Sequence, residues 1–167
     1  MQKMLYEKFS AKMYGICLRY AHHPEDAKDI LQDGFVKVYQ KIEQVKNPKA
    51  FPGWIRRVII NTALEKYRSQ VLLQRIDESQ LGGKEEVSGD VLDQLNAESL
   101  MNMIKELSPK YRMVFNLYAI EGYSHREIST LLDIEESTSR SQYTRAKNML
   151  SNILIKKRII EAPKEKF

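Results

Sequence analysis

The chain has 167 residues, which is enough for one ordinary domain or two small ones. Its formal net charge of +5 favours a polyanionic partner. The single cysteine, Cys17, excludes a disulfide framework and fits a reducing cytoplasm, and no apolar run resembles a secretory signal or a membrane span, so we expect a soluble cytoplasmic protein.

Apolar residues recur at helical spacing through most of the chain, and Gly and Pro are scarce, which predicts an all-α protein. In the first half, the expected helices cover residues 5–20, 24–42 and 52–68, with a loop at 44–50. Pro24 suits the first turn of the second helix, and the acidic residues that follow it suit the positive end of the helix dipole. We interpret Cys17 as a core residue of the first helix.

The second predicted helix carries an acidic ridge. Its members are Asp26, Asp29, Gln32 and Asp33, which lie beside Phe35 and Val36. The helix has more apolar residues than one narrow stripe can bury, so it can present a surface to a partner protein. An ordinary solvated face is the alternative.

The third predicted helix mixes aromatic and basic residues. It contains Arg56, Arg57, Lys66 and Arg68 together with Trp54, Asn61, Thr62 and Tyr67. Aromatic rings stack on unpaired bases and cations follow the backbone in sites for single-stranded nucleic acid, so the pattern indicates such a site. The alternative is that Trp54 and Tyr67 are core residues.

A change of composition divides the chain. Residues 79–93 are polar, acidic and contain several glycines, which predicts a linker. The boundaries that we expect are a first domain at 1–71, a linker at 72–94, a second domain at 95–158 and a tail at 159–167. In the second domain, one stripe contains Leu100, Met103, Ile104 and Leu107, and Ser108 and Pro109 start the next helix.

The segment GYSHREISTLLDIEESTSRSQYTRAKNML, residues 122–150, predicts a helix-turn-helix. Ser124 and Glu127 form a capping box, and Asp133 and Ile134 break the first helix. The second helix turns Tyr143, Ala146, Leu150 and Ile153 inward. Its opposite face has residue types that read base edges and hold phosphates, namely Ser137, Arg140, Ser141, Thr144 and Arg145. A solvated amphipathic helix of a small bundle is the alternative.

Four segments together resemble the bacterial sigma factors of the small extracytoplasmic-function group. They are DAKDILQDGFVKVYQKI, FPGWIRRVIINTALEKYR, LSPKYRMVFNLYAIEGYSHREISTLLDI and STSRSQYTRAKNML, in this order and with the acidic linker between the second and third. The resemblance covers nearly the whole chain. It implies two small helical domains joined by a flexible acidic linker, and a protein that binds core RNA polymerase, recognises the −35 and −10 promoter elements and assists −10 melting.

The resemblance also implies roles for individual positions. The helix at 26–42 would dock on the clamp helices of RNA polymerase, through Asp26, Asp29, Gln32, Phe35 and Val36. The loop at 44–51 and the following helix would take the non-template −10 strand, through Asn47, Trp54, Arg57, Asn61 and Arg68. The second helix of the helix-turn-helix would read the −35 element, through Ser137, Thr138, Arg140, Ser141, Thr144, Arg145 and Lys147. The polymerase flap, promoter DNA and an anti-sigma factor are the further partners implied.

This chain departs from the family pattern at the start of the recognition helix. Ser137-Thr138-Ser139 replaces a frequent Gly-Thr-Val run, Glu135 replaces Ser or Pro, and Gln142 replaces Arg. We expect Ser139 to face inward and Gln142 to remove a phosphate contact. We expect His125 to be exposed to solvent.

Two other functions are compatible with parts of the pattern. A stand-alone helix-turn-helix regulator would normally dimerise, and the sequence has no convincing dimerisation helix. A nucleic-acid enzyme would need a nucleophile with a carboxylate or metal cluster, and His22, His23 and His125 are not at ligand spacing with Cys17 or paired acids. We therefore expect no catalytic residue, metal or cofactor.

Overall fold

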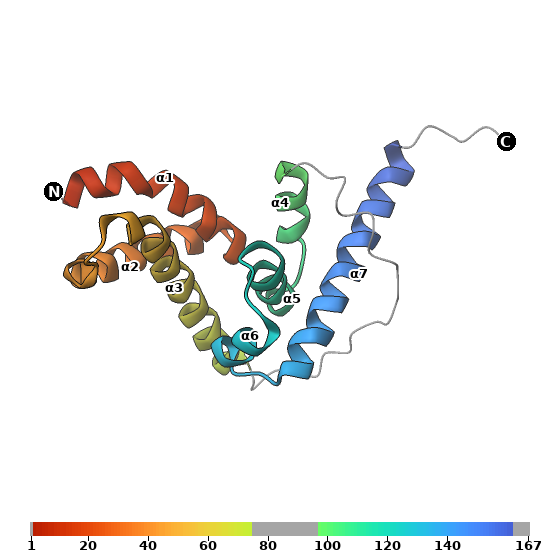
Figure 1. The fold of residues 1–167 in the computed structure, drawn as a ribbon. Coiled ribbons are helices and arrows are strands. Elements are labelled where there is room, and N and C mark those ends of the chain that lie inside the picture. The colour runs from red at the N-terminus through yellow and green to blue at the C-terminus, as the bar shows by residue number, and fades with distance from the viewer. Residues whose placement is uncertain (1, 75–96, 162–167) are drawn as a thin grey trace. The chain divides into compact units, whose positions relative to one another are not determined.

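The computed structural model describes residues 2–74 and 97–161, and in these ranges the chain is helical and contains no strand (Figure 1). It divides into two compact units, Met1–Ser79 and Gln80–Phe167, here called the N-terminal and C-terminal units. The predicted class, two small helical domains, is confirmed. Most of the predicted linker at 72–94 lies outside the described residues, but residues 72–74 are helical, so its predicted start is too early.

The N-terminal unit contains three helices, α1 (Gln2–Tyr20), α2 (Pro24–Lys41) and α3 (Phe51–Gln74). Two 3-10 turns, Ile42–Gln44 and Pro48–Ala50, connect α2 to α3. The third helix continues six residues beyond the predicted end at residue 68, because the sequence that follows Arg68 contains no Gly or Pro to stop it.

Apolar residues of all three helices form the core of this unit. Cys17 is fully buried there, and burial raises the pKa of its thiol to about 12, so it is a protonated core residue as predicted. The helices α2 and α3 approach closely at Gly34, where a Cβ atom would collide with the δ-methyl of Ile59. Because Ile59 is fully buried, a larger residue at position 34 would force the packed helices to shift.

The C-terminal unit contains α4 (Ala97–Lys105), α5 (Pro109–Phe115), a π-helical turn (Asn116–Ile120), α6 (His125–Leu132) and α7 (Glu136–Glu161). Because α7 reaches Glu161, the predicted tail at 159–167 begins too early. The predicted apolar stripe is confirmed: Met103 and Ile104 of α4 and Leu107, two residues after its end, are buried with residues of α5 and α7, and Leu100 packs against them. Gly122 ends the π-helical turn in the left-handed region, with φ of 80°, which a glycine adopts without steric cost.

Arg112 on α5 is a charged residue in this core. It is only 1 % exposed, and its Nη2 donates to the carbonyl oxygens of Leu107 at 2.8 Å and Lys105 at 3.2 Å. These carbonyls lie at the end of α4, where a helix leaves acceptors without intrahelical partners. Arg112 therefore holds the α4–α5 corner by a buried charge-assisted contact.

Candidate nucleic-acid interface

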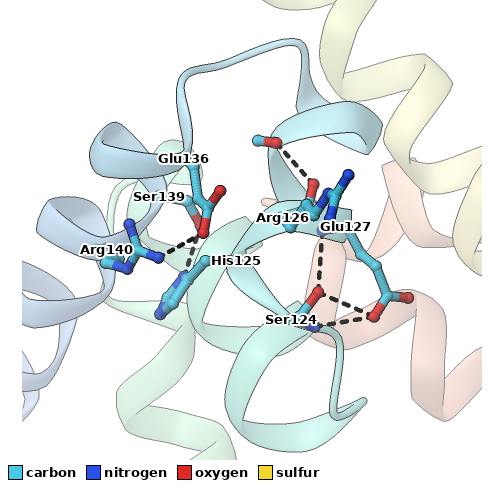
Figure 2. A network of polar contacts seen from close by, with 8 residues as sticks. Ser124, His125, Arg126, Glu127, Glu136, Ser139 and Arg140 are labelled. Carbon is cyan, nitrogen blue, oxygen red and sulfur yellow. Dashed lines mark hydrogen bonds and ion pairs between the residues drawn. The ribbon is translucent and has the colours of Figure 1, made fainter.

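The turn between α6 and α7 is built from short-range contacts. Ser124 Oγ accepts a hydrogen bond from the backbone N–H of Glu127 at 3.1 Å, and Glu127 Oε1 accepts one from the backbone N–H of Ser124 at 3.3 Å (Figure 2). This capping box was predicted and is confirmed. Asp133 ends α6 with φ of 54° and so turns the chain into α7, as its helix-breaking position predicted.

The long helix α7 has a buried and an exposed side. Ala146 and Leu150 are fully buried, and Tyr143 and Ile153 pack against the same core, which confirms the predicted inward stripe. The predicted base-reading residues Ser137, Arg140, Ser141, Thr144 and Arg145 are exposed, whereas Thr138 and Lys147 are half-buried. Lys147 Nζ lies 5.2 Å from the centre of the Tyr143 ring.

A polar contact joins the first residue of α6 to α7. His125 Nδ1 lies 2.8 Å from Ser139 Oγ, and Ser139 is fully buried, as predicted. The imidazole also stacks on Tyr118, with ring centres 4.2 Å apart and planes at 10°. The prediction that His125 faces solvent was wrong, since its ring is half-buried between these groups.

The surroundings of His125 favour its neutral form. Burial lowers the pKa of the imidazole and the positive charge of Arg140 lowers it further, while Glu136 opposes both effects. The sequence contained a signal for this contact, because Ser139 was expected to face inward. A buried hydroxyl requires a partner, and the first turn of α6 supplies it.

Glu136 and Arg140 form an ion pair one turn apart on α7, which sequence analysis missed. Their side chains are 41 % and 60 % exposed. The pair lies at the N-terminal end of α7, beside His125, as Figure 2 shows. Exposed pairs of this spacing stabilise a helix only slightly, by about 0.3–0.5 kcal/mol, so its main consequence is the orientation of Arg140.

The candidate −10 residues lie on α3 and the loop before it. Arg57, Asn61 and Arg68 are exposed on α3. Trp54 is half-buried, and its ring centre lies 5.7 Å from that of Phe51, so part of its surface packs within the unit and part is accessible to solvent. Asn47 caps the second 3-10 turn, since its Oδ1 accepts from the backbone N–H of Lys49 at 3.0 Å.

Two residues of the aromatic and basic pattern on α3 serve the fold. Thr62 is buried, and its hydroxyl donates to the carbonyl of Val58 at 2.8 Å. Lys66 Nζ lies 3.6 Å from an Asp26 carboxylate oxygen and 3.5 Å from one of Asp29. Its ammonium thus faces the acidic ridge of α2 instead of a phosphate backbone.

Most side chains of the acidic ridge on α2 are exposed to solvent. Asp29, Gln32, Asp33 and Val36 are exposed, and Asp26 is half-buried. Phe35 is 2 % exposed and its ring meets that of Tyr6 edge-on at 4.9 Å, so the prediction that Phe35 faces a partner was wrong. The 3.6-residue period places Phe35 with the buried Leu31 and Val38, whereas Gln32 and Val36 lie one turn apart on the adjacent, exposed side.

The comparisons with known proteins match both units. Residues 5–72 match sigma-70 region 2, and residues 97–150 match sigma-70, region 4. The chain belongs to the sigma-70 family. The matches place it in the extracytoplasmic-function group, and its function is promoter-specific initiation of transcription. Sigma factors are initiation factors without catalytic activity of their own.

Several relatives cover most of the chain at low identity. The chain is 24 % identical to the ECF RNA polymerase sigma-E factor of Haemophilus influenzae, over 89 % of this chain and 85 % of that protein. It is 24 % identical to the RNA polymerase sigma-H factor of Pseudomonas aeruginosa, over 90 % of this chain and 84 % of that protein. The sigma factor RpoE of Bartonella quintana, solved in complex with the anti-sigma factor NepR, has the same fold, with a TM-score of 0.53 and 17 % identity over 91 % of this chain and 95 % of that chain.

In the parts of the chain that the structure describes, no group of three or more His, Cys, Asp or Glu residues could hold a metal ion. None of the helices in those ranges is both long and apolar enough to cross a membrane.

Proposed function

We propose that this sigma factor reads the −35 element with the N-terminal half of α7. The observation that carries the proposal is the position of Arg140, Ser141, Thr144 and Arg145, which are exposed opposite the buried Ala146–Leu150 side of the helix. A recognition helix places its N-terminal side chains against base edges in the major groove. Ser137 and Thr138 lie at the same end, and Lys147 lies farther along, at a position suited to a phosphate.

The −10 element would be bound by the N-terminal unit. Asn61 offers an amide that can donate and accept hydrogen bonds, while Arg57 and Arg68 offer charges for the backbone. The half-buried Trp54 exposes part of its ring on the same helix. Asn47 contributes indirectly, since its side chain holds the shape of the loop before α3.

Core RNA polymerase would dock on the open side of α2. Asp29, Gln32 and Val36 supply a mixed acidic, polar and apolar surface, and Val36 is 53 % exposed. Asp26 borders this surface and Phe35 supports it from within. The polymerase clamp helices and flap are the partner surfaces in this proposal, and the cytoplasm is its location. An anti-sigma factor is a further partner, by analogy with the Bartonella quintana protein, and no residue is assigned a catalytic role.

The experiment that tests this proposal is in vitro transcription with core polymerase and a library of promoters. We expect the chain to start transcription only with core polymerase present, at promoters that share −35 and −10 elements. Initiation at none of the library promoters would contradict the proposal, and specific DNA binding without polymerase would favour a stand-alone regulator.

Single variants in the same assay separate base reading from phosphate binding. Arg140→Ala and Arg145→Ala should relax the preference at one or two −35 positions, because a bidentate Arg–base contact discriminates by about 1–3 kcal/mol. Lys147→Ala should weaken binding to all promoters alike. It should also reduce the slope of log affinity against log salt concentration by about one. If Lys147→Ala alone changes base preference, the proposed orientation of α7 in the groove is wrong.

A further inference from the structure

The ion pair at the start of α7 places a carboxylate beside a proposed base-reading arginine. Glu136 lies in the first turn of the helix, and its Oε1 accepts from Nη2 of Arg140, one turn later. Both side chains are exposed on the same side of α7. Any docking of α7 that brings Arg140 to a base edge therefore brings the Glu136 carboxylate into the same groove.

The chemistry of the two groups allows both to contact DNA at once. A guanidinium has five N–H donors in a planar fork, and a bidentate contact with guanine O6 and N7 uses two of them. The remaining donors can keep the bond to Glu136. A carboxylate that holds one edge of the guanidinium fixes its plane, so fewer rotamers must be ordered on binding.

The Glu136 carboxylate can also contact base edges directly. It is an acceptor only, so it is repelled by guanine O6 and N7 and by thymine O4, whereas it can accept from cytosine N4 or adenine N6. Its charge opposes phosphate binding in general. An acidic residue at this position therefore lowers affinity for DNA of any sequence and raises the penalty for a wrong base.

We propose that Glu136 is a specificity-determining residue for the −35 element. It orients Arg140 toward a guanine and selects a cytosine or adenine on the strand that it faces, at the neighbouring base pair. The inference rests on the proposed reading of the −35 element by α7. It differs from a purely structural role, in which Glu136 would only stabilise α7 through its attraction to the positive end of the helix dipole.

The test uses the full-length chain with core polymerase and a promoter library that varies the −35 element and keeps the −10 element constant. The variants are Glu136→Ala and Glu136→Gln, with Glu135→Ala as the matched control. Glu135 is exposed one residue earlier, and its replacement changes the net charge by the same amount. Circular dichroism verifies that α7 keeps its helicity in each variant.

We expect Glu136→Ala to lower discrimination roughly tenfold at the Arg140 position and its neighbour, within the range for one good base contact. Binding to DNA of unrelated sequence should rise at low salt. Glu136→Gln should shift the neighbouring preference toward adenine, because an amide pairs with adenine N6 and N7. Glu135→Ala should leave the base preferences unchanged.

Two results would overturn the inference, and they are distinguishable. In the first, Glu136→Ala and Glu136→Gln change transcription from all −35 sequences by one common factor, as the control does, while Arg140→Ala still changes base preference. Glu136 then acts only through its charge. If Arg140→Ala and Arg145→Ala also leave base preference unchanged, the proposed −35 reading by α7 fails and the role of Glu136 fails with it.

Discussion

The two units position their candidate binding residues by different means. In the C-terminal unit, the contacts that shape the interface lie within one helix-turn-helix: Ser124 with Glu127, Glu136 with Arg140, and His125 of α6 with Ser139 of α7. In the N-terminal unit, α2 and α3 are joined by contacts between distant residues, such as Lys66 with Asp29 and Lys37 with Glu65.

This difference determines how each surface responds to mutation. Replacing a residue of the helix-turn-helix alters a local geometry that the neighbouring turn specifies. Replacing a charged residue of α2 also changes the partner on α3, so the proposed polymerase surface and the proposed −10 helix are electrostatically linked through Lys66.

Truncating the core of one unit should unfold that unit alone. Leu150 is fully buried in the C-terminal unit, and Leu150→Ala should cost about 2–5 kcal/mol of unfolding free energy. Amide hydrogen exchange on the full chain should show lost protection in residues 97–150 and unchanged protection in residues 5–72. A similar loss in both ranges would mean that the two units do not fold independently.

Charge reversal on α2 should weaken polymerase binding. Asp29→Arg removes an exposed carboxylate and places a cation near Lys66, so we expect the Kd for core polymerase to rise roughly tenfold or more. The measurement is a binding titration with core polymerase. Glu98→Arg, an equal charge change on the exposed surface of α4, is the control. Equal Kd values for Asp29→Arg and the unaltered chain would remove Asp29 from the proposed surface.

Loss of one amide on α3 should impair promoter melting. Asn61 is exposed, and a lost hydrogen bond to an unpaired base should slow open-complex formation roughly five- to tenfold on duplex promoters. A promoter with a pre-melted −10 bubble should restore part of the rate for Asn61→Ala. Gln70→Ala, on an exposed position of the same helix, should behave as the unaltered chain. Equal defects on both templates would indicate a folding effect instead.

Acidic pH should destabilise the C-terminal unit through His125. The folded-state pKa of His125 lies below its ordinary value of 6.5, so protons bind more readily to the unfolded chain. The contribution to stability is therefore complete above about pH 6.5 and is lost as the pH falls through the lowered folded-state pKa.

The comparison that isolates this contribution uses His125→Phe combined with Ser139→Ala, which keeps a ring against Tyr118 and removes both polar partners. The Tm of the unaltered chain should fall more steeply with decreasing pH than that of the double variant, by no more than about 4 °C. Glu136 opposes the lowering of the His125 pKa, so in a Glu136→Gln variant the folded-state pKa should lie lower still, and the loss of Tm should continue to lower pH and become larger than in the unaltered chain. Parallel Tm curves would exclude His125 as the source.

The helices, the two-unit organisation and the helix-turn-helix could all be predicted from the sequence. These features depend on helical periodicity, on capping signals and on a turn, all of which act over a few residues. The buried side of α7 followed for the same reason, since Ala146 and Leu150 repeat at helical spacing and the polar residues follow the opposite side.

The packing of separate helices determines which of the predicted site residues serve the fold instead of a binding surface. Lys66 belonged to a pattern typical of nucleic-acid binding, yet its ammonium pairs with acids 37 and 40 positions earlier in the chain, Asp29 and Asp26. His125 was expected in solvent, but Tyr118 and Ser139 enclose it. Phe35 was expected on a binding surface, but α1 covers it through Tyr6. Periodicity shows which side of a helix is apolar, whereas the neighbour that covers a given side chain depends on how separate helices pack.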